Sequence, residues 1–349
     1  MKKINRREAL KVGAIGAAGL ATGAMFLPNK VLAKTAKKAI LKTASEKVKS
    51  NSALTLIEQA KIAFERDEPL KASVMEILVK SSDLLQYMPF KSISGNAMAF
   101  NSSIGHRITE ALTIAGGDLD VDACKAPSAG EIDLDFIDFR SKQECTKIKS
   151  LGQSLSKTIV NGNSEKDPKV FNGLQVRCKG RQLINNDNGA LSLYKLDRLI
   201  ASVNKPTHLL MNKIMSRRLR IYYHDRKDGD IDRKYRHIDW ELDNFGRRVT
   251  KYNNLPIMIS GKDHENDKIL PFTEGDAYGM PQCTSIYCLS FAENGVVGLQ
   301  HNEMKVHDLG EITTKPVYRT RVEWYVTIAL FNTRAAARLQ YIKDGPIKA

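Results

Sequence analysis

The sequence predicts an α+β fold, and three stretches of the chain carry this prediction. Residues 131–174 contain a long run of helical periodicity, residues 318–328 alternate as a β-strand does, and residues 175–310 mix short strand and helix patterns. A chain of 349 residues with 42% hydrophobic content is long enough to bury a large core, in one elaborate domain or two.

The longest helix is predicted within residues 131–174. Its apolar residues recur mostly three or four positions apart, at Ile132, Phe136, Phe139, Cys145, Ile148, Leu151, Leu155 and Ile159. This spacing places a single buried stripe along one helix. Asn161-Gly162-Asn163 should end it, because Gly and Asn tolerate the left-handed conformation after a helix C-terminus. About 30 residues give a length on the order of 45 Å, which is typical of a spine rather than of a compact core helix.

Two shorter helices are predicted in residues 52–87, on either side of a break at Asp67-Glu68-Pro69. Residues 88–101 then alternate in polarity around Ser94-Gly95-Asn96, which predicts a β-hairpin. Because a lone hairpin is only marginally stable, its apolar face needs a partner chain.

A return strand is predicted over residues 112–121. Asp118, Asp120 and Asp122 would share one face of this strand. Three carboxylates in this order are compatible with a metal site, but a solvated strand face is the favoured interpretation.

Residues 175–310 predict a region of mixed short elements. The predicted elements are a helix at 191–203, a buried strand at 207–211, a helix at 213–223 capped by Asn212, and strands at 255–259 and 284–291. Residues 224–241 form the densest charge cluster of this region. Its acidic residues do not follow the EF-hand order, so a charged surface loop is favoured over a calcium site.

The clearest strand of the chain lies near its C-terminus, in residues 311–349. Its two faces carry Tyr318, Thr320, Val322, Trp324, Val326 and Ile328 on one side, and Arg319, Arg321, Glu323, Tyr325 and Thr327 on the other. The apolar face should pack beneath the long helix, and the charged face suits solvent or a neighbouring subunit. Residues 332–341 predict a short closing helix.

The net charge of +15 is concentrated at the N-terminus, where residues 1–50 hold twelve Lys and Arg against Glu8 and Glu46. Residues 1–33 resemble a twin-arginine export leader, with Arg6 and Arg7 before a weakly apolar run and cleavage expected after Ala33. An amphipathic N-terminal arm that imitates a signal, or a start codon placed too early, would give the same pattern. Residues 34–51 predict a basic linker or arm.

No catalytic constellation is recognisable in the sequence. The seven histidines are scattered, and nucleophile elbows, phosphate loops and dinucleotide fingerprints do not occur. The five cysteines are odd in number and form no C-x-x-C pair, which predicts buried reduced thiols rather than a disulfide or zinc framework. The sequence therefore predicts a protein that is not an enzyme, with no catalytic, cofactor or metal site.

Three segments together resemble the major capsid proteins of tailed bacteriophages, which share the Hong Kong 97-like coat fold. They are the end of the long helix, NGN-S-x-x-DP-x-x-F-x-GL, the run LTIAGGDLDVD at 112–122, and the C-terminal run KPVYRTRVEWYVTIALFNTRAAARL. The resemblance extends over residues 52–343. It implies an N-arm (52–87), an extended β-hairpin loop (88–130), a spine helix with a peripheral sheet (131–174 and 311–349), and a mixed α/β apical domain (175–310).

The resemblance implies a structural shell protein that self-assembles into an icosahedral phage or prophage head. Its expected partners are many copies of itself arranged as pentamers and hexamers, packaged double-stranded DNA held by non-specific contact, and scaffolding, portal and other head proteins. It implies no cofactor or small-molecule substrate, assembly in the bacterial cytoplasm, and a final location in the virion.

Two alternatives remain open at the level of sequence. One is an encapsulin-like cellular compartment, which has the same fold but holds protein cargo, so the contents would distinguish it. The other takes the leader at face value and predicts a twin-arginine-exported periplasmic protein, including a cofactor-containing enzyme. A coloured or metal-bearing purified protein would favour that alternative.

Overall fold

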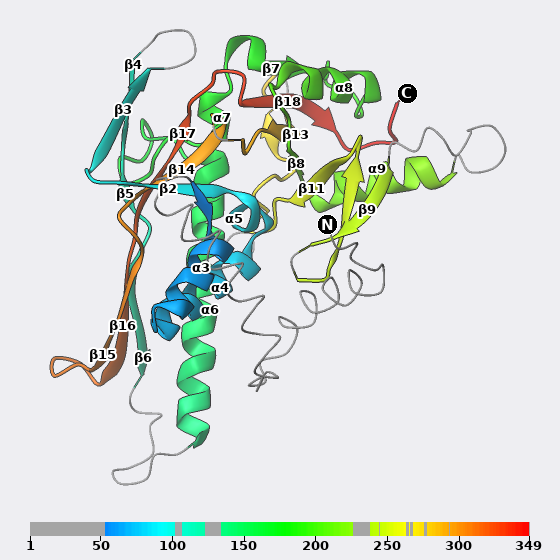
Figure 1. Cartoon of the computed structure of the whole chain (residues 1–349). Helices are drawn as coiled ribbons and strands as arrows, with labels where there is room; N and C mark the ends of the chain where they lie inside the picture. Colours follow the sequence, from blue (N-terminus) through cyan, green and yellow to red (C-terminus); the bar gives the residue numbers. More distant parts are fainter. Residues whose placement is uncertain are drawn as a thin grey trace, which may run out of the picture.

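A computed structural model describes residues 53–101, 107–122, 134–225, 238–243, 245–262, 265, 268–275, 278–292 and 294–348. The chain forms an α+β structure in which one long helix runs beside four β-sheets (Figure 1). The N-terminal leader and linker predicted at 1–51, and most of the charge cluster predicted at 224–241, lie outside the described residues. Within the described chain, no helix combines the length and the apolar character needed to cross a membrane.

The described chain begins with a compact helical unit of α3 (Leu56–Glu65), α4 (Pro69–Ser81) and α5 (Asp83–Tyr87). A capping box starts α3, in which Thr55 Oγ1 accepts from the N–H of Glu58 at 3.3 Å and the Glu58 carboxylate accepts from the N–H of Thr55 at 3.0 Å. Pro69 occupies the first turn of α4, where its missing N–H is harmless. The predicted pair of helices and the break between them are therefore confirmed.

The long helix is α6 (Leu134–Asn161), 28 residues in length. Its end at Asn161 is as predicted, but the expected left-handed residue is not found: Asn161, Gly162 and Asn163 all lack a positive φ. Close approach explains the glycines instead. A Cβ on Gly162 would lie 2.3 Å from the carbonyl oxygen of Phe171, and one on Gly173 would lie 2.6 Å from that of Thr158.

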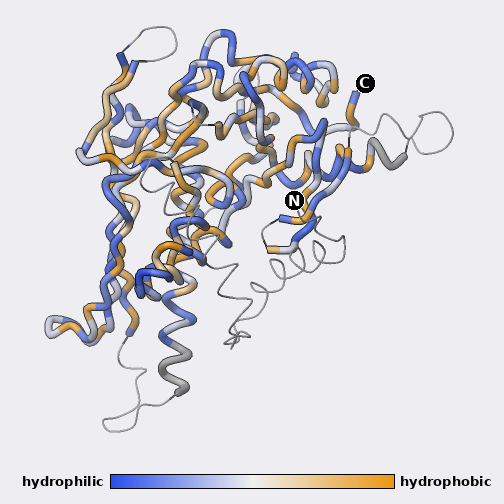
Figure 2. Tube along the Cα trace, viewed as in Figure 1, coloured by the Kyte–Doolittle hydropathy of each residue, from blue (hydrophilic) through white to orange (hydrophobic). Residues whose placement is uncertain are grey.

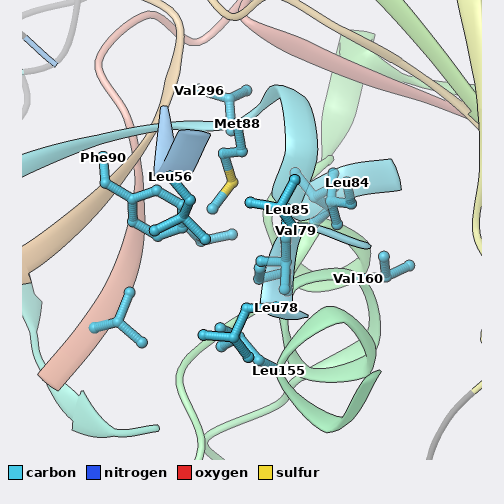
Figure 3. Close-up of a cluster of buried hydrophobic side chains, with 14 of the residues drawn as sticks. Leu56, Leu78, Val79, Leu84, Leu85, Met88, Phe90, Leu155, Val160 and Val296 are labelled. Atoms are coloured by element: carbon cyan, nitrogen blue, oxygen red, sulfur yellow. The ribbon is translucent and has the colours of Figure 1, made fainter. Parts of the chain in front are cut away.

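The larger core fills the space between α6, the helical unit and the nearby sheets. Leu155 and Val160 of α6 face Leu78, Val79 and Leu85 of the helical unit (Figure 3). The hydropathy-coloured trace shows apolar and polar segments alternating along α6, as expected of a helix with one buried stripe (Figure 2).

A five-stranded sheet lies next to this core, in the order β1-β2-β14-β17-β5. Its strands are β1 (Leu54–Thr55), β2 (Pro89–Ile93), β14 (Val296–His301), β17 (Tyr325–Leu330) and β5 (Thr113–Ile114). A three-stranded sheet extends from it along α6, and its strands are β15 (Lys305–Glu311), β16 (Val317–Glu323) and β6 (Gly117–Asp122). The single C-terminal strand predicted at 318–328 thus divides at Trp324 between two sheets, while Val322, Trp324, Val326 and Ile328 are buried as predicted.

The predicted hairpin at 88–101 is wrong in its pairing. β2 pairs with β1 and β14, and the hairpin is formed one strand later, between β3 (Ala97–Asn101) and β4 (Arg107–Ala111). The reason is burial: Phe90 of β2 is 1% exposed, and its ring lies against Gly298, where a Cβ would be 2.3 Å from Phe90 Cδ1. β2 is therefore drawn into the core and is unavailable to β3.

The second half of the chain builds an eight-stranded sheet in the order β7-β18-β13-β8-β11-β10-β9, with β12 paired to β13. The strands are β7 (Leu183–Asn185), β8 (His208–Met211), β9 (Ile238–Leu242), β10 (Arg248–Tyr252), β11 (Leu255–Ile259), β12 (Glu274–Gly275), β13 (Pro281–Leu289) and β18 (Ala336–Lys343). The helices are α7 (Leu174–Arg177), the 3₁₀ helix η2 (Gly180–Gln182), α8 (Leu193–Ser202) and α9 (Lys213–Asp225). Asn212 caps α9 as predicted, with its Oδ1 accepting from the N–H of Met215 at 2.8 Å.

This sheet is buried on both faces. Along β8, Leu210 joins the core shared with α6, while Leu209 and Met211 join a second core beneath α8 and α9. Alternation of side chains across the strand accounts for this division.

The closing helix predicted at 332–341 is wrong. This segment forms most of β18, which pairs antiparallel with β13 and parallel with β7. Leu339 and Ile342 are completely buried there. The alanine-rich sequence favours a helix, but pairing on both sides within a buried sheet overrides this weak local preference.

Candidate subunit-contact surfaces

The hairpin β3–β4 projects from the body of the molecule (Figure 1). Its register runs from Ala97 opposite Ala111 to Asn101 opposite Arg107. Exposed and half-buried residues alternate along both strands, so no residue of the hairpin is fully buried. The exposed face carries mainly small side chains, which would let a second chain approach the backbone closely.

Two contacts attach the other face of the hairpin to the body. Arg177 of α7 forms a bidentate ion pair with Glu110 of β4, with Nη2 and Oε2 2.7 Å apart. The two side chains are only 13% and 12% exposed. The ring of Phe100 lies 4.7 Å from that of Phe331 at the end of β17. These contacts set the direction in which the hairpin projects.

A groove of about 830 Å³ opens where the hairpin joins the body. It is lined by Asn96, Leu112, Thr113, Ile114, Pro168, Lys169, His301 and Tyr325. Ile114 and Tyr325 are paired across β5 and β17 and are 67% and 41% exposed. β5 is the short edge of its sheet, so this edge combines unpaired backbone groups with exposed apolar side chains.

The three-stranded sheet presents a charge ladder, which consists of Asp118 and Asp120 of β6 and Arg319 and Arg321 of β16. Arg319 Nη2 lies 2.7 Å from Asp120 Oδ2, and Arg321 Nε lies 2.7 Å from Asp118 Oδ1. The hydrogen bonds and charges of these arginines lower the pKa of both aspartates. The favoured interpretation of this acidic stretch, a strand face rather than a metal site, agrees with these ion pairs.

Arg140 joins α6 to the same sheet. Its Nε lies 2.9 Å from Glu144 Oε1, its Nη2 lies 2.7 Å from Asp308 Oδ1, and its guanidinium stacks 5.2 Å from the ring of Tyr318. Burial is the largest single influence on Asp308 and opposes its ionisation, but the hydrogen bonds from Arg140 and from the N–H of Gly310, together with the charge of Arg140, outweigh it and lower the pKa. The predicted packing of the C-terminal strand beneath the long helix is thus confirmed.

A carboxylate also fastens the N-terminal helical unit. Glu303, between β14 and β15, accepts from Lys71 Nζ at 2.6 Å and from Arg66 Nη1 at 3.0 Å. Burial of Glu303 favours its neutral form, yet the two cations outweigh burial and lower its pKa. Sequence reasoning placed Asp118, Asp120, Arg319 and Arg321 on strand faces but identified none of these ion pairs, because the partners lie far apart along the chain and no local signal marks them.

The cysteines agree with the prediction of buried reduced thiols. Of those described, Cys178, Cys283 and Cys288 are buried and Cys145 is half-buried, and none of the four forms a disulfide. Burial raises the pKa of Cys178 and of Cys288 to about 12, which keeps both in the unreactive thiol form. Among the described residues, no three His, Cys, Asp or Glu side chains are grouped as metal ligands. Arg6, Arg7 and Ala33 of the predicted leader lie outside the described chain.

Comparison with known proteins identifies the fold. No protein-family model matches the sequence, and no curated protein matches it. The structure is similar to the encapsulin of the holo-SrpI complex from Synechococcus elongatus PCC 7942, with a TM-score of 0.50 and 18% identity over 74% of this chain and 87% of that one. Lower scores relate it to a putative prophage capsid protein of E. coli CFT073 (TM-score 0.42, 11% identity, 82% and 99% covered) and to a virus-like particle from Pyrococcus furiosus (0.41, 10%, 77% and 96%).

The likeness to the encapsulin agrees with the arrangement derived above from the residues. A helical N-terminal unit, a projecting hairpin, a long helix beside a narrow sheet and a region of mixed strands and helices follow one another along the chain. The chain has the Hong Kong 97-like capsid fold.

Proposed function

We propose that this protein is a structural coat protein whose copies associate into a closed shell. The observation that carries the proposal is the hairpin β3–β4, which projects from a large, well-packed body and buries none of its residues fully. Such a hairpin is marginal on its own. A neighbouring copy supplies the missing cover, and heterologous contacts of this kind close into rings.

The groove beside β5 supports the same proposal. Ile114 and Tyr325 expose apolar surface at a sheet edge, which soluble monomers usually avoid. The hairpin of one copy and the groove at its base lie next to each other, so one continuous contact region would serve both.

The finer proposal is a phage or prophage head assembled from pentamers and hexamers around double-stranded DNA, together with scaffolding and portal proteins. Assembly would take place in the host cytoplasm. The second candidate is an encapsulin-like compartment, which is favoured by the likeness to the cyanobacterial encapsulin at a TM-score of 0.50. Nuclease-protected DNA in purified particles would support the head, and stoichiometric protein cargo would support the compartment.

The test of the shell is the size of the purified full-length protein. We expect size-exclusion chromatography and negative-stain microscopy to show rings of five or six subunits or closed particles. An Ala99→Trp substitution on the exposed face of the hairpin should abolish these assemblies while leaving a folded subunit. Ala99→Ser, a matched small substitution, should assemble normally. Assemblies that are indifferent to Ala99→Trp would contradict the role given to the hairpin.

Export is a separate proposal that rests on the sequence of residues 1–33 alone, with Arg6 and Arg7 before a weakly apolar run and cleavage expected after Ala33. If the leader works, the protein in its bacterial host begins at residue 34 and lies in the periplasm, and an Arg6→Lys, Arg7→Lys double variant stays uncleaved. Intact-mass measurement of the N-terminus decides this. An unprocessed cytoplasmic protein would exclude the exported alternative.

A further inference from the structure

Helices α8 and α9 cover the same face of the eight-stranded sheet. The buried residues that they contribute to one shared core are Leu196, Leu199, Met215 and Leu219. The C-terminal segment ties the two helices together. The N–H of Leu193 donates to the carbonyl of Lys348 at 2.9 Å, and Arg218 Nε lies 2.6 Å from Asp344 Oδ1. Their solvent-facing sides therefore lie on the same side of the sheet, and together we call them the α8–α9 face.

Several basic side chains on this face have no counter-charge among the described residues. They are all exposed and have no ion-pair or hydrogen-bond partner there: Arg181, Arg198, Lys205, Lys213, Arg217 and Arg220. Three acidic side chains described nearby are already occupied. Asp197 accepts from Tyr252 Oη at 2.9 Å, Asp187 is paired with Lys195, and Asp344 is paired with Arg218.

The unpaired charges are grouped rather than scattered. Arg181 and Arg198 line one groove of about 700 Å³ between η2, β7 and α8. Lys213, Arg217 and Arg220 are spaced four and three residues apart on α9 and so lie along one side of that helix. A rigid layer thus presents two clusters of positive charge to solvent.

This grouping is unfavourable for the isolated subunit. Like charges spaced three or four apart on a helix repel each other. Lys213 also lies in the first turn of α9, where the helix dipole disfavours a cation and where no acidic residue compensates. Local rules that are broken in this way, with no compensating contact among the described residues, are typical of functional surfaces.

We propose that the α8–α9 face binds the phosphate backbone of nucleic acid, without base readout. Arginine predominates among the unpaired residues, and its planar fork fits phosphate oxygens in a bidentate manner. Repeated charge along a rigid duplex matches two basic clusters on one rigid layer. This inference rests on the proposed shell function, because it names the surface that faces the enclosed nucleic acid.

The test measures binding of a fluorescent random-sequence DNA duplex to the unassembled full-length protein by anisotropy, as a function of salt. An Arg217→Gln, Arg220→Gln double variant should bind about tenfold more weakly at low salt and lose about 2 from the slope of log affinity against log salt. The matched control is Lys61→Gln, Lys149→Gln, which removes the same charge from exposed, unpaired positions on α3 and α6. The control should bind as the wild type does.

Four results would overturn the proposal. The first three are a wild type that does not bind DNA, an α9 variant that binds DNA as tightly as the wild type, and a control variant that loses as much DNA affinity as the α9 variant. The fourth uses poly-glutamate as a second probe: an α9 variant that loses binding to poly-glutamate but keeps its DNA affinity would assign the face to an acidic protein partner instead. Negative-stain images of the wild type and the α9 variant under assembly conditions, separate from the binding assay, keep the two proposals distinguishable. If the α9 variant binds DNA normally and still forms particles, only the proposal for the α8–α9 face fails. If the wild type binds DNA but forms no particles, only the shell proposal fails.

Discussion

The three-stranded sheet and the α8–α9 face handle charge in opposite ways. On the sheet, Arg319 and Arg321 meet Asp118 and Asp120 from a strand about two hundred residues earlier in the chain. On the α8–α9 face, the arginines have no such partners among the described residues. The first arrangement is complete within one subunit. The second has no such complement within the described part of the subunit, which is why we propose that a partner supplies it.

The difference separates charge that stabilises a fold from charge that serves a partner. Exposed ion pairs stabilise little individually, but cross-strand pairs in a ladder fix the register of β6 against β16. Unpaired charges give no ion-pair stability, and they add repulsion where they are grouped, so their grouping on one face favours a binding role over solubility alone. Four changes would break or sharpen this comparison, and they are ordered here by the size of the expected effect.

The largest effect on stability is expected at Trp324, which lies between the three-stranded sheet and the core. Trp324 is 1% exposed, its Nε1 donates to Gln300 Oε1 at 3.0 Å, and its ring lies 5.2 Å from that of Phe90. Trp324→Ala should lower the free energy of unfolding by about 3–5 kcal/mol, because it leaves a cavity and an unpaired buried amide. Urea denaturation of the unassembled subunit measures this. Trp324→Phe should lose less, and equal losses would show that the ring does not fill the site.

As pH is lowered, protonation linked to His208 of the eight-stranded sheet should reduce stability at a higher pH than protonation of the charge ladder does. His208 of β8 stacks between Tyr87 and Phe291, and burial lowers its pKa from 6.5 to about 4. The unfolded chain therefore takes up a proton between about pH 6.5 and 4 that the folded chain does not, so stability falls as pH falls through this window, by roughly 1–3 kcal/mol.

The aspartates of the ladder act at lower pH. Their pKa values are lowered in the folded state, so they stabilise the fold above the ordinary aspartate pKa of about 4, and this stabilisation is lost only as pH falls below it. Unfolding midpoints measured from pH 8 to 3 should show both windows. In His208→Gln the upper window should disappear and the lower one should remain; an unchanged profile would contradict the assignment.

Arg140, which joins α6 to the three-stranded sheet, should have an intermediate effect on stability. Arg140→Ala removes contacts with Glu144, Asp308 and Tyr318. The expected loss is about 1–2 kcal/mol, since the side chain is only 20% exposed and its partners lose charge-assisted bonds. Thermal unfolding of the subunit gives the measurement. Arg140→Lys should recover part of the loss. If Arg140→Ala changes stability by less than the error of the measurement, Arg140 stabilises the fold no more than an ordinary surface ion pair does.

The same contrast explains which features the sequence alone could predict. The spine helix, the cap at Asn212 and the buried face through Val322 and Trp324 depend on local periodicity and capping, and they were predicted correctly. The partner of β3, the strand nature of β18 and the pairing of Arg319 with Asp120 depend on contacts between distant segments, which no window of sequence contains. Arg217 and Arg220 are visible in the sequence, but only the structure shows that nothing in the described chain neutralises them.

The smallest effect on stability, and the sharpest test of the comparison, comes from the α9 variant. Arg217→Gln with Arg220→Gln removes two exposed cations that have no described partners, so the free energy of unfolding should stay the same or rise by at most about 0.5 kcal/mol as repulsion is relieved.

Salt should then separate the two regions. Added NaCl screens both the repulsion on α9 and the attraction in the ladder. The free energy of unfolding of the wild type should therefore rise toward that of the α9 variant as salt is added. It should fall toward that of an Arg321→Gln ladder variant. Urea denaturation at 20 mM and 500 mM NaCl provides the measurement. A clear loss of stability in the α9 variant at low salt would mean that these arginines are paired within the fold, and the distinction between the two surfaces would fail.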